Sequence, residues 1–394
     1  MPDCFPSWRS FPPTHRFLTI ALGLFPLLLL GSPVQHATVF FEKGKYGGWP
    51  ATHGIWSWGD EILVGFTVGI YQDRGDRHHI ATDQPVSHMQ GRSRDGGLTW
   101  TLENPNQQHQ LLPEGTSLHG TELPGVPLPE WKPSPGDIRF TAPDFAMTLK
   151  LNNNHVGPSR FYLTYNRGRD WSGPYRLPAV NGLQIAARTD YQVRSPSACD
   201  FFLTAAKANQ REGRVFLLRS TQHGRRWEFV SWVGEEPSGF SIMPSTIRLA
   251  KGSYYTVLRH RDGSKRGLRA YRSIDDGKTW HREIDPVTDL GAGNPGSLLQ
   301  LPDGTLALTY GVRKEPFRIA AKLSRDQGRS WSAEGIIRHD GSSADVGYTQ
   351  SVLRPDGKVV TVYYFSDAIT GPERYIGASI WDPKTLYFPS PQSP

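Results

Sequence analysis

The stretch Ser93–Trp100, which reads Ser-Arg-Asp-Gly-Gly-Leu-Thr-Trp, decides the fold because it recurs along the chain. Two close copies stand at Ser273–Trp280 and Ser324–Trp331, and a fourth, Ser220–Trp227, has lost its Asp but keeps Ser, Gly and Trp in place. In such a phrase the Ser and Asp oxygens accept backbone N–H groups across a tight turn, Gly permits a positive φ, and Trp anchors the turn on a sheet. Recurrence at a spacing of about fifty residues is typical of a repeat architecture such as a propeller.

The same order of strands and turns precedes each phrase. One unit has strand-like runs at 245–249, 254–259 and 268–272, and Asp-Gly turns at 303–304 and 356–357 divide strands of the following units. Asp-Gly between alternating runs is a strong hairpin signal. The units together predict an all-β fold, a six-bladed β-propeller of four-stranded antiparallel blades. The last unit lacks a fourth strand after Trp381, and Thr38–Glu42 could supply it and close the ring.

The composition agrees with many short strands joined by turns, since the 394 residues include 41 Gly, 32 Pro, 12 Trp and 15 Tyr. The units run nearly from end to end, so we expect one large domain over residues 38–388, with a surface insertion at 112–135 and a frayed tail at 389–394. The formal net charge of +7 suits an acidic ligand. Because Lys and Arg are scattered rather than clustered, the charge does not indicate nucleic-acid binding.

The N-terminus has the pattern of a targeting segment. Arg9, His15 and Arg16 precede an apolar run, residues 17–31, that is too short for a comfortable membrane span. We expect a secretory signal peptide over residues 1–37, cleaved near Ala37, rather than an uncleaved anchor. Cys4 would leave with it, so Cys199 would remain as a single buried thiol and no intrachain disulfide could form. This favours a secreted or periplasmic protein of bacterial type without stable membrane insertion.

The recurring phrase resembles the Asp-box, or BNR repeat, of the sialidase superfamily, and the resemblance extends along most of the predicted domain. In that superfamily the boxes lie at the periphery of the blades, away from the active site. The resemblance therefore implies structural roles for Asp95, Asp275 and Asp326. It places the chemistry at the central mouth of the propeller, where the entries of the inner strands converge.

Sialidases bind the carboxylate of the sugar with three arginines and attack the anomeric carbon with a Tyr that a Glu activates. Arg suits this task because it pairs bidentately with a carboxylate and stays charged. The resemblance assigns the nucleophile to Tyr348, the second arginine to Arg259 and the third to Arg318, with Arg313 as a near competitor. It places the acid/base in the loop of the first blade, at Asp73, Asp76 or Asp83.

Two elements of the sialidase pattern are absent from the sequence. The first arginine normally stands before Ile-Pro at the head of the first blade, and here Trp49 precedes Pro50. The Glu partner of the Tyr has no counterpart in residues 240–245. The resemblance therefore favours the fold and an acidic glycan more than it favours sialic acid itself.

Other polar residues stand at the predicted entries of inner strands, where a propeller gathers them around its funnel. A pair of carboxyl groups there could divide acid and base roles. His53 with Tyr348 could instead abstract a proton beside a uronate carboxylate, which is lyase chemistry. The His78-His79 pair lies in a charged loop that we expect to be solvated. The candidates at the strand entries are His53, Arg139, Asp144, Arg188, Asp190, Asn294, Asp345, Tyr348 and Gln350.

These observations predict an exported carbohydrate-active enzyme that hydrolyses glycosidic bonds of acidic glycans. The expected catalytic residues are Tyr348, Asp73, Asp190 and His53. The expected substrate-binding residues are Arg139, Asp144, Arg188, Arg259, Arg313, Arg318 and Asp345. We expect a monomer that needs no cofactor and no metal. Two alternatives stay open, a uronate polysaccharide lyase and a non-catalytic glycan-binding propeller.

Overall fold

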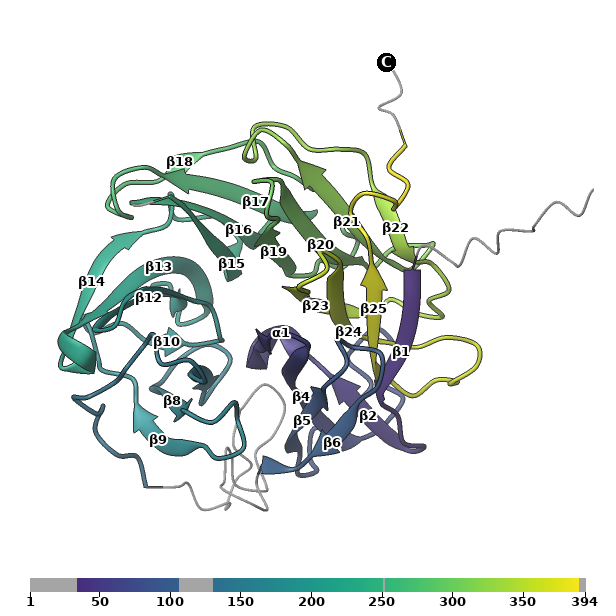
Figure 1. Ribbon diagram of the computed structural model, residues 1–394, viewed down its shortest axis with the longest axis horizontal. Helices are drawn as coiled ribbons and strands as arrows, with labels where there is room; N and C mark the ends of the chain where they lie inside the picture. Colours follow the sequence, from purple (N-terminus) through teal and green to yellow (C-terminus); the bar gives the residue numbers. More distant parts are fainter. Residues whose placement is uncertain (1–33, 106–129, 251, 390–394) are drawn as a thin grey trace, which may run out of the picture. The chain divides into compact units, whose positions relative to one another are not determined.

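Six antiparallel sheets follow one another around a ring in the order of the chain (Figure 1). The computed structural model describes residues 34–105, 130–250 and 252–389, and residues 33–394 form one unit of the chain. Most of the expected signal peptide, most of the expected insertion and nearly all of the expected tail lie outside the described residues. The predicted six-bladed propeller is confirmed.

Blades 1 to 3 come from the first half of the chain, and two of them have an interrupted inner strand. In blade 1 the pieces β2 and β3 both pair with β4, and in blade 3 the pieces β10 and β11 both pair with β12. Blade 2 has three strands among the described residues. Their bounds are β2 (Lys45–Gly48), β3 (Ile55–Trp58), β4 (Glu61–Ile70), β5 (Ser87–Ser93) and β6 (Thr101–Glu103); β7 (Ala146–Leu151), β8 (Ser159–Thr164) and β9 (Ser172–Arg176); β10 (Ile185–Ala186), β11 (Tyr191–Ser195), β12 (Ala198–Ala206), β13 (Glu212–Thr221) and β14 (Arg226–Trp232).

Blades 4 to 6 are regular four-stranded meanders, and the last one is completed by the N-terminal strand. Strand β24 reads Val-Val-Thr-Val-Tyr-Tyr-Phe and is buried throughout, as expected for β-branched and aromatic residues packed between two neighbouring blades. The bounds are β15 (Phe240–Ala250), β16 (Ser253–Asp262), β17 (Lys265–Ser273) and β18 (His281–Arg282); β19 (Gly296–Gln300), β20 (Leu306–Val312), β21 (Arg318–Ser324) and β22 (Gly335–Arg338); β23 (Gly347–Leu353), β24 (Val359–Phe365), β25 (Tyr375–Trp381) and β1 (Val34–Phe40).

The ring closes as the sequence predicted, because β1 pairs antiparallel with β25, from Val34 opposite Trp381 to Phe40 opposite Ile376. Pairing the two ends of the described chain leaves this edge of blade 6 covered. The strand begins at Val34, four residues before the predicted Thr38. Residues 34–37, which the sequence placed at the end of the signal peptide, are therefore part of the closing strand.

The Asp-box turns join the third strand of a blade to the fourth, as predicted. In blade 5, Ser324 Oγ donates to Asp326 Oδ1 at 2.8 Å, and the amide of Ser330 donates to the same oxygen at 2.9 Å. Hydrogen bonds from the Ser330 hydroxyl and amide lower the pKa of Asp326 to about 2. Gly328 has φ +94° and its amide donates to Ser324 Oγ. The carboxylate is thus occupied within its own turn, in agreement with a structural role. We call the end of the ring that carries these turns the box face, and the opposite end the mouth face.

Blade 2 carries a worn version of the same turn. Asn166 stands in the position of the Asp, and Thr164 Oγ1 donates to Asn166 Oδ1 at 2.8 Å. The amide of Gly168 donates to Thr164 Oγ1 at 2.9 Å, as the corresponding Gly does in the complete boxes. The turn therefore needs an acceptor oxygen at this position more than it needs a charge.

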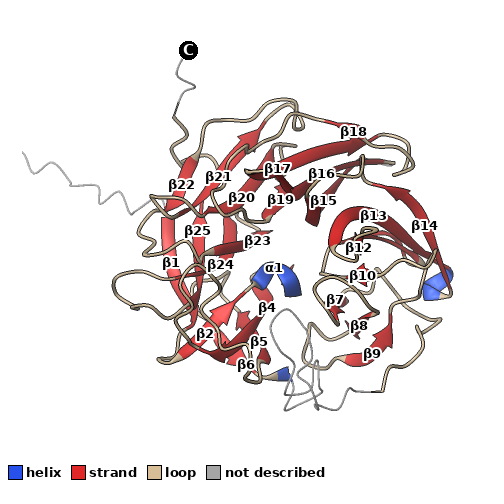
Figure 2. Cartoon of the chain, turned by 180° about the vertical axis from the view of Figure 1, so that it is seen from behind, coloured by secondary structure: helices blue, strands red, loops and turns tan. Residues whose placement is uncertain are grey.

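A one-turn helix, α1 (Pro50–His53), lies in the middle of the ring (Figure 2). It interrupts the inner strand of blade 1 and contacts β4, β7 and β23. Thr148 Oγ1 in β7, the innermost described strand of blade 2, donates to the carbonyl of His53 at 2.8 Å. The helix thus fills the channel beside the blade that has three described strands.

Candidate functional site

Asp345 is the centre of a polar cluster on the mouth face, just before the inner strand β23 of blade 6. Its Oδ1 accepts hydrogen bonds from the Tyr364 hydroxyl at 2.7 Å and from His78 Nδ1 at 2.6 Å. Its Oδ2 accepts the backbone amide of His79 at 3.1 Å. Blade 6 and the long β4–β5 loop of blade 1, 267 residues apart in sequence, therefore meet at this carboxylate.

Two guanidinium groups enclose the same carboxylate. Arg313 Nη2 lies 3.9 Å from Asp345 Oδ1, and Arg374 Nε lies 3.6 Å from Oδ2. Burial opposes ionisation, but the hydrogen bond from His78 and the guanidinium groups of Arg313 and Arg374 outweigh it and hold the pKa of Asp345 well below its usual range. Asp345 is therefore ionised and acts as an acceptor.

Because Asp345 is ionised, it determines which ring nitrogen of a neutral His78 carries the proton. The imidazole must carry its proton on Nδ1 to donate to the carboxylate, so the basic nitrogen of the neutral ring is Nε2. Burial lowers the pKa of His78 below its ordinary value, although Asp345 opposes this effect. His78 is accordingly a neutral base at neutral pH, with its ring oriented by a fixed carboxylate.

Tyr348 is held in place by an unusual backbone. It has φ +49°, in the left-handed region, and its amide donates to Asn294 Oδ1 at 3.0 Å. The preceding Gly347 has φ +109°, and a Cβ there would lie 2.0 Å from Asn294 Nδ2, so only glycine fits. Strained backbone of this kind concentrates at functional sites. The Gly-Tyr step therefore fixes where the Tyr348 side chain projects.

The Tyr348 hydroxyl lies among cations and beside His78. Arg259 Nη1 donates to this oxygen at 3.0 Å, and the Arg313 guanidinium lies 5.4 Å from the centre of the Tyr348 ring. Arg259 Nε is buried and has no hydrogen-bond partner among the described residues. The ring centres of His78 and Tyr348 lie 6.2 Å apart, edge to face. The arrangement offers positive charge to an anionic group and keeps a phenol and a neutral imidazole together.

A cavity of about 520 Å³ opens beside Asp345, His78 and Arg313; Tyr348, which is 3% exposed, and Arg259 lie behind these residues and do not line it. Its volume falls within the range of small-molecule sites, and charged groups line it together with the small residues of the 342–344 loop. The lining residues that carry chemistry are Asp76, Arg77, His78, His79, Arg313 and Asp345.

The structure brings some of the expected site residues together here and leaves others elsewhere. Tyr348, Arg259, Arg313 and Asp345 converge. Arg318, which competed with Arg313, instead donates from Nε to Glu334 at 2.7 Å, so Arg313 is the arginine at the mouth. The Asp73 side chain is 77% exposed and lies 3.2 Å from His79 Nδ1, at the rim of the loop.

Three further candidates lie in the channel wall. His53 on α1 is buried, with Nε2 2.9 Å from Thr67 Oγ1 and Nδ1 3.0 Å from His88. Arg188 forms a bidentate pair with Glu212 at 2.7 and 3.2 Å. Asp190 accepts from Thr246 Oγ1 at 2.9 Å, and burial raises the pKa of Asp190 to about 8 despite that bond. The bonds of His53 and Asp190 do not join them to Tyr348 or Asp345, whereas the Arg188 guanidinium lies close enough to Tyr348 to interact with it electrostatically.

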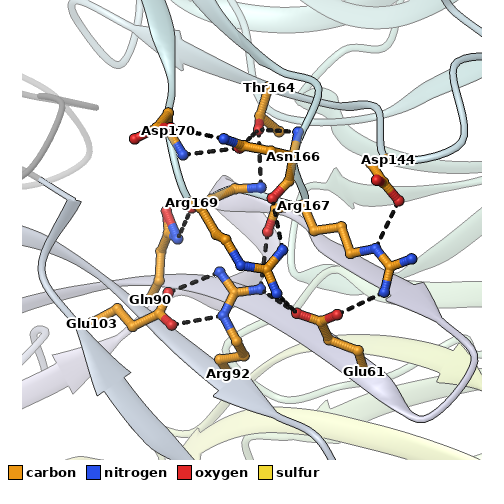
Figure 3. A network of polar contacts seen from close by, with 11 residues as sticks. Glu61, Gln90, Arg92, Glu103, Asp144, Thr164, Asn166, Arg167, Arg169 and Asp170 are labelled. Atoms are coloured by element: carbon orange, nitrogen blue, oxygen red, sulfur yellow. Dashed lines mark hydrogen bonds and ion pairs between the residues drawn. The ribbon is translucent and has the colours of Figure 1, made fainter.

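Arg139 and Asp144 lie at the box face. Asp144 accepts from Arg167 Nε at 2.7 Å, in a network that joins blades 1 and 2 through Glu61 (Figure 3). Arg139 is exposed, and its guanidinium stacks 4.8 Å from the centre of the Tyr165 ring. The sequence placed both at the entry of an inner strand, but β7, which follows them, is joined to the box turn at its start through the pairing of Ala146 with Thr164.

Sequence reasoning missed three members of the cluster. Tyr364 lies in the apolar run of β24 and looks like a core residue, and Arg374 stands in a loop without a motif. His78 is less solvated than expected: its side chain is 23% exposed, and it is hydrogen-bonded to Asp345 and packed edge to face on the ring of Trp49, 5.2 Å away. The sequence signal that could have found His78 is its place in the first-blade loop, where the resemblance already sought the acid/base.

The comparisons with known proteins agree with this geometry. Residues 146–361 match the family described as the BNR repeat-like domain. The chain belongs to this family. No curated protein sequence matches the chain.

Solved structures with the same fold include proteins that act on glycans. A protein of unknown function from Dyadobacter fermentans has a TM-score of 0.66 at 18% identity, over 88% of this chain and 98% of that one. The NanB sialidase of Streptococcus pneumoniae has a TM-score of 0.57 at 11% identity, over 90% and 71%. The α-L-arabinanase of Penicillium chrysogenum, complexed with arabinobiose, has a TM-score of 0.57 at 13% identity, over 89% and 99%. Identities this low establish the sialidase-like propeller and leave the reaction to the site itself.

Proposed function

We propose that this BNR-repeat propeller hydrolyses glycosidic bonds of an acidic glycan at its mouth face. The observation that carries the proposal is the placement of Tyr348 between Arg259 and Arg313, beside the Asp345–His78 pair. A substrate carboxylate would pair with the Arg259 guanidinium, whose buried Nε has no partner among the described residues. The sialidase-like fold of the solved relatives supports a glycan as the substrate class.

In this proposal His78 takes the role of the absent Glu. Its Nε2 accepts the proton of the Tyr348 hydroxyl, directly or through one water, as the phenolic oxygen attacks the anomeric carbon. The imidazolium then gives this proton to the leaving glycosidic oxygen. In the second step the oxygen of a water bonds to the anomeric carbon and its proton passes to His78. The bond between the sugar and the Tyr348 oxygen breaks, and His78 returns the proton to that oxygen, so both residues regain their starting states. Arg259 stabilises the negative charge that develops on the phenolic oxygen while its bond to the sugar forms and breaks.

The neutral state of His78 favours a second candidate, β-elimination from a uronate-containing chain. Arg259 and Arg313 would neutralise the uronate carboxylate, and His78 Nε2 would take the proton from the adjacent carbon. The Tyr348 hydroxyl would protonate the leaving oxygen, and a carbon–carbon double bond would form in the product. Elimination does not need the Glu that activates the Tyr in sialidases and that is absent from residues 240–245.

A panel of acidic oligosaccharides tests both candidates in one experiment. New reducing ends without ultraviolet absorbance support hydrolysis, and reducing ends with absorbance from a conjugated double bond support elimination. Glycan binding without any product would make the protein a lectin and would refute the catalytic proposal. Tyr348→Phe serves as the control, because it removes the hydroxyl and keeps the ring that packs against Tyr364.

We also propose that the protein is exported through its N-terminal segment. Because β1 begins at Val34, cleavage that leaves Val34 in place preserves the whole closing strand. Mass spectrometry of the secreted protein would identify the new N-terminus. A start well beyond Ala37 would contradict the proposal, since the chain would then lose most of its pairing with β25.

A further inference from the structure

A second cavity, of about 550 Å³, lies on blade 4 outside the cluster at Asp345. Strands β16, β17 and β18 form its floor, and residues 285–289 form its outer wall. His260 in this floor directly follows Arg259 in β16, so the two side chains project to opposite faces of the blade. The cavity is therefore separate from the mouth, although both use the same strand.

Three polar atoms of residues lining this cavity are buried and have no hydrogen-bond partner among the described residues. They are His260 Nε2, Arg269 Nε and Asp285 Oδ1. His260 is only 6% exposed, and its other ring nitrogen lies 2.9 Å from Ser241 Oγ. Buried polar groups in folded proteins are nearly always paired, so three unpaired groups around one cavity call for an explanation.

The spacing of these atoms suits a bridging hydroxyl. Arg269 Nε and Asp285 Oδ1 lie 3.9 Å apart, which is too far for a direct hydrogen bond and close enough for one oxygen to contact both. One other atom of each side chain already has a hydrogen-bond partner. Arg269 Nη1 donates to Glu235 at 3.3 Å, and Asp285 Oδ2 accepts from Arg282 at 3.1 Å.

The charge around the cavity is balanced. Its cations are Lys265, Arg269 and Arg282, and its anions are Asp262, Asp285 and Asp289. Such a lining does not favour a strongly charged ligand. Leu268 and Val287 add apolar surface against which the C–H face of a sugar ring can pack.

We propose that this cavity is a second carbohydrate subsite, which takes a neutral sugar unit through its hydroxyl groups. The Asp285 carboxylate accepts from a hydroxyl, Arg269 donates to the same or a neighbouring oxygen, and His260 pairs with a third group. The proposal rests on the proposed function in one respect, that glycans are the ligands of this protein. It deepens that function, because a glycan would be held at two places on blade 4.

Saturation-transfer NMR on the full chain, with D-galactose, L-arabinose and N-acetyl-D-glucosamine as probes, tests the subsite. We expect transfer to at least one sugar in the wild type and in Arg259→Met, in which the mouth is disabled. Asp285→Asn replaces an acceptor oxygen by a donor, so we expect affinity to fall about tenfold or more. Asp60→Asn, an exposed carboxylate in the β3–β4 turn of blade 1, is the matched control and should bind as the wild type does.

Each outcome bears on the proposal separately from the reaction at the mouth. No transfer to any of the sugars, or unchanged binding in Asp285→Asn, overturns the subsite. Binding that is lost in Arg259→Met and kept in Asp285→Asn places the sugar at the mouth and also overturns it. Binding that depends on Asp285 in a protein that cleaves no acidic glycan supports the subsite and contradicts the proposed function alone. If Asp285→Asn melts early, Thr288→Trp at the exposed rim blocks the cavity without altering its floor.

Discussion

The two faces of this propeller use carboxylates in opposite ways. At the box face, Asp326 is bound by Ser324 and Ser330, all within seven residues of one turn. At the mouth face, Asp345 is bound by His78, Tyr364, Arg313 and Arg374, which come from blades 1, 5 and 6. The first carboxylate shapes its own loop, while the second orients a base that belongs to another blade. The comparison teaches that repetition along the chain marks structure here, and that the unrepeated residues carry the chemistry.

The largest effect is expected on turnover, when His78, the base at the mouth, is replaced. His78→Gln should lower turnover of the acidic glycan by roughly 10²–10⁴-fold, since the amide cannot accept a proton from Tyr348. The pH–rate profile of the wild type should fall toward low pH, because only neutral His78 is active. As burial lowers the pKa of His78, this fall should lie below the range of an ordinary histidine. A wild-type profile that falls at or above the ordinary histidine range would contradict the assignment.

Arg259, which donates to the Tyr348 hydroxyl, should contribute more to substrate binding than Arg318, which pairs with Glu334 outside the cluster. Arg259→Met should raise KM about tenfold to a hundredfold, because it removes the cation beside Tyr348 and leaves a side chain of similar length. Arg318→Met is the matched control, since Arg318 pairs with Glu334 and should leave KM unchanged. Steady-state kinetics give the KM of each variant for comparison with the wild type. Equal effects would place Arg318 in the site after all.

Changes at the box face should affect stability and leave the reaction intact. Asp326→Ala should lower the free energy of unfolding by about 1 kcal/mol, because the Ser330 amide and hydroxyl lose their acceptor. Asp326→Asn should cost less, since Asn166 already serves in the equivalent turn of blade 2. Urea unfolding measures both variants, and unchanged kcat/KM is the accompanying expectation. A loss of turnover without a loss of stability would refute the structural role.

The smallest expected effect concerns Asp190 in the channel wall. Its folded-state pKa of about 8 lies above the ordinary value of 3.8, so its protonated form stabilises the fold, and this contribution is lost as pH rises toward 8. Asp190→Asn keeps a neutral side chain of the same shape at every pH. The melting temperature of the variant should therefore exceed that of the wild type by a few degrees at about pH 8 and equal it at about pH 4. A constant difference across this range would show that Asp190 does not titrate as described.

The sequence allowed the ring and its six units to be predicted because they rest on local patterns, and the closure because the last unit lacked a fourth strand. Asp-Gly turns, the Ser–Asp–Gly–Trp phrases and alternating strands act over a few residues, and β1 lacked any other partner for its strand-like run. The same local patterns misled the analysis at blade 2. There Arg139 and Asp144 precede a strand that starts from the box face, so the position that looked like a strand entry at the mouth lies at the other end.

The sequence by itself determined the fold class, the structural role of the boxes and the candidacy of Tyr348, Arg259, Arg313 and Asp345. Only the tertiary structure decided that His78 is oriented by Asp345, that Arg313 rather than Arg318 stands at the mouth, and that Tyr364 and Arg374 complete the cluster. The physical reason is distance along the chain. Hydrogen bonds within a turn are encoded in adjacent residues, whereas a contact between His78 and Asp345 depends on how six blades close the ring.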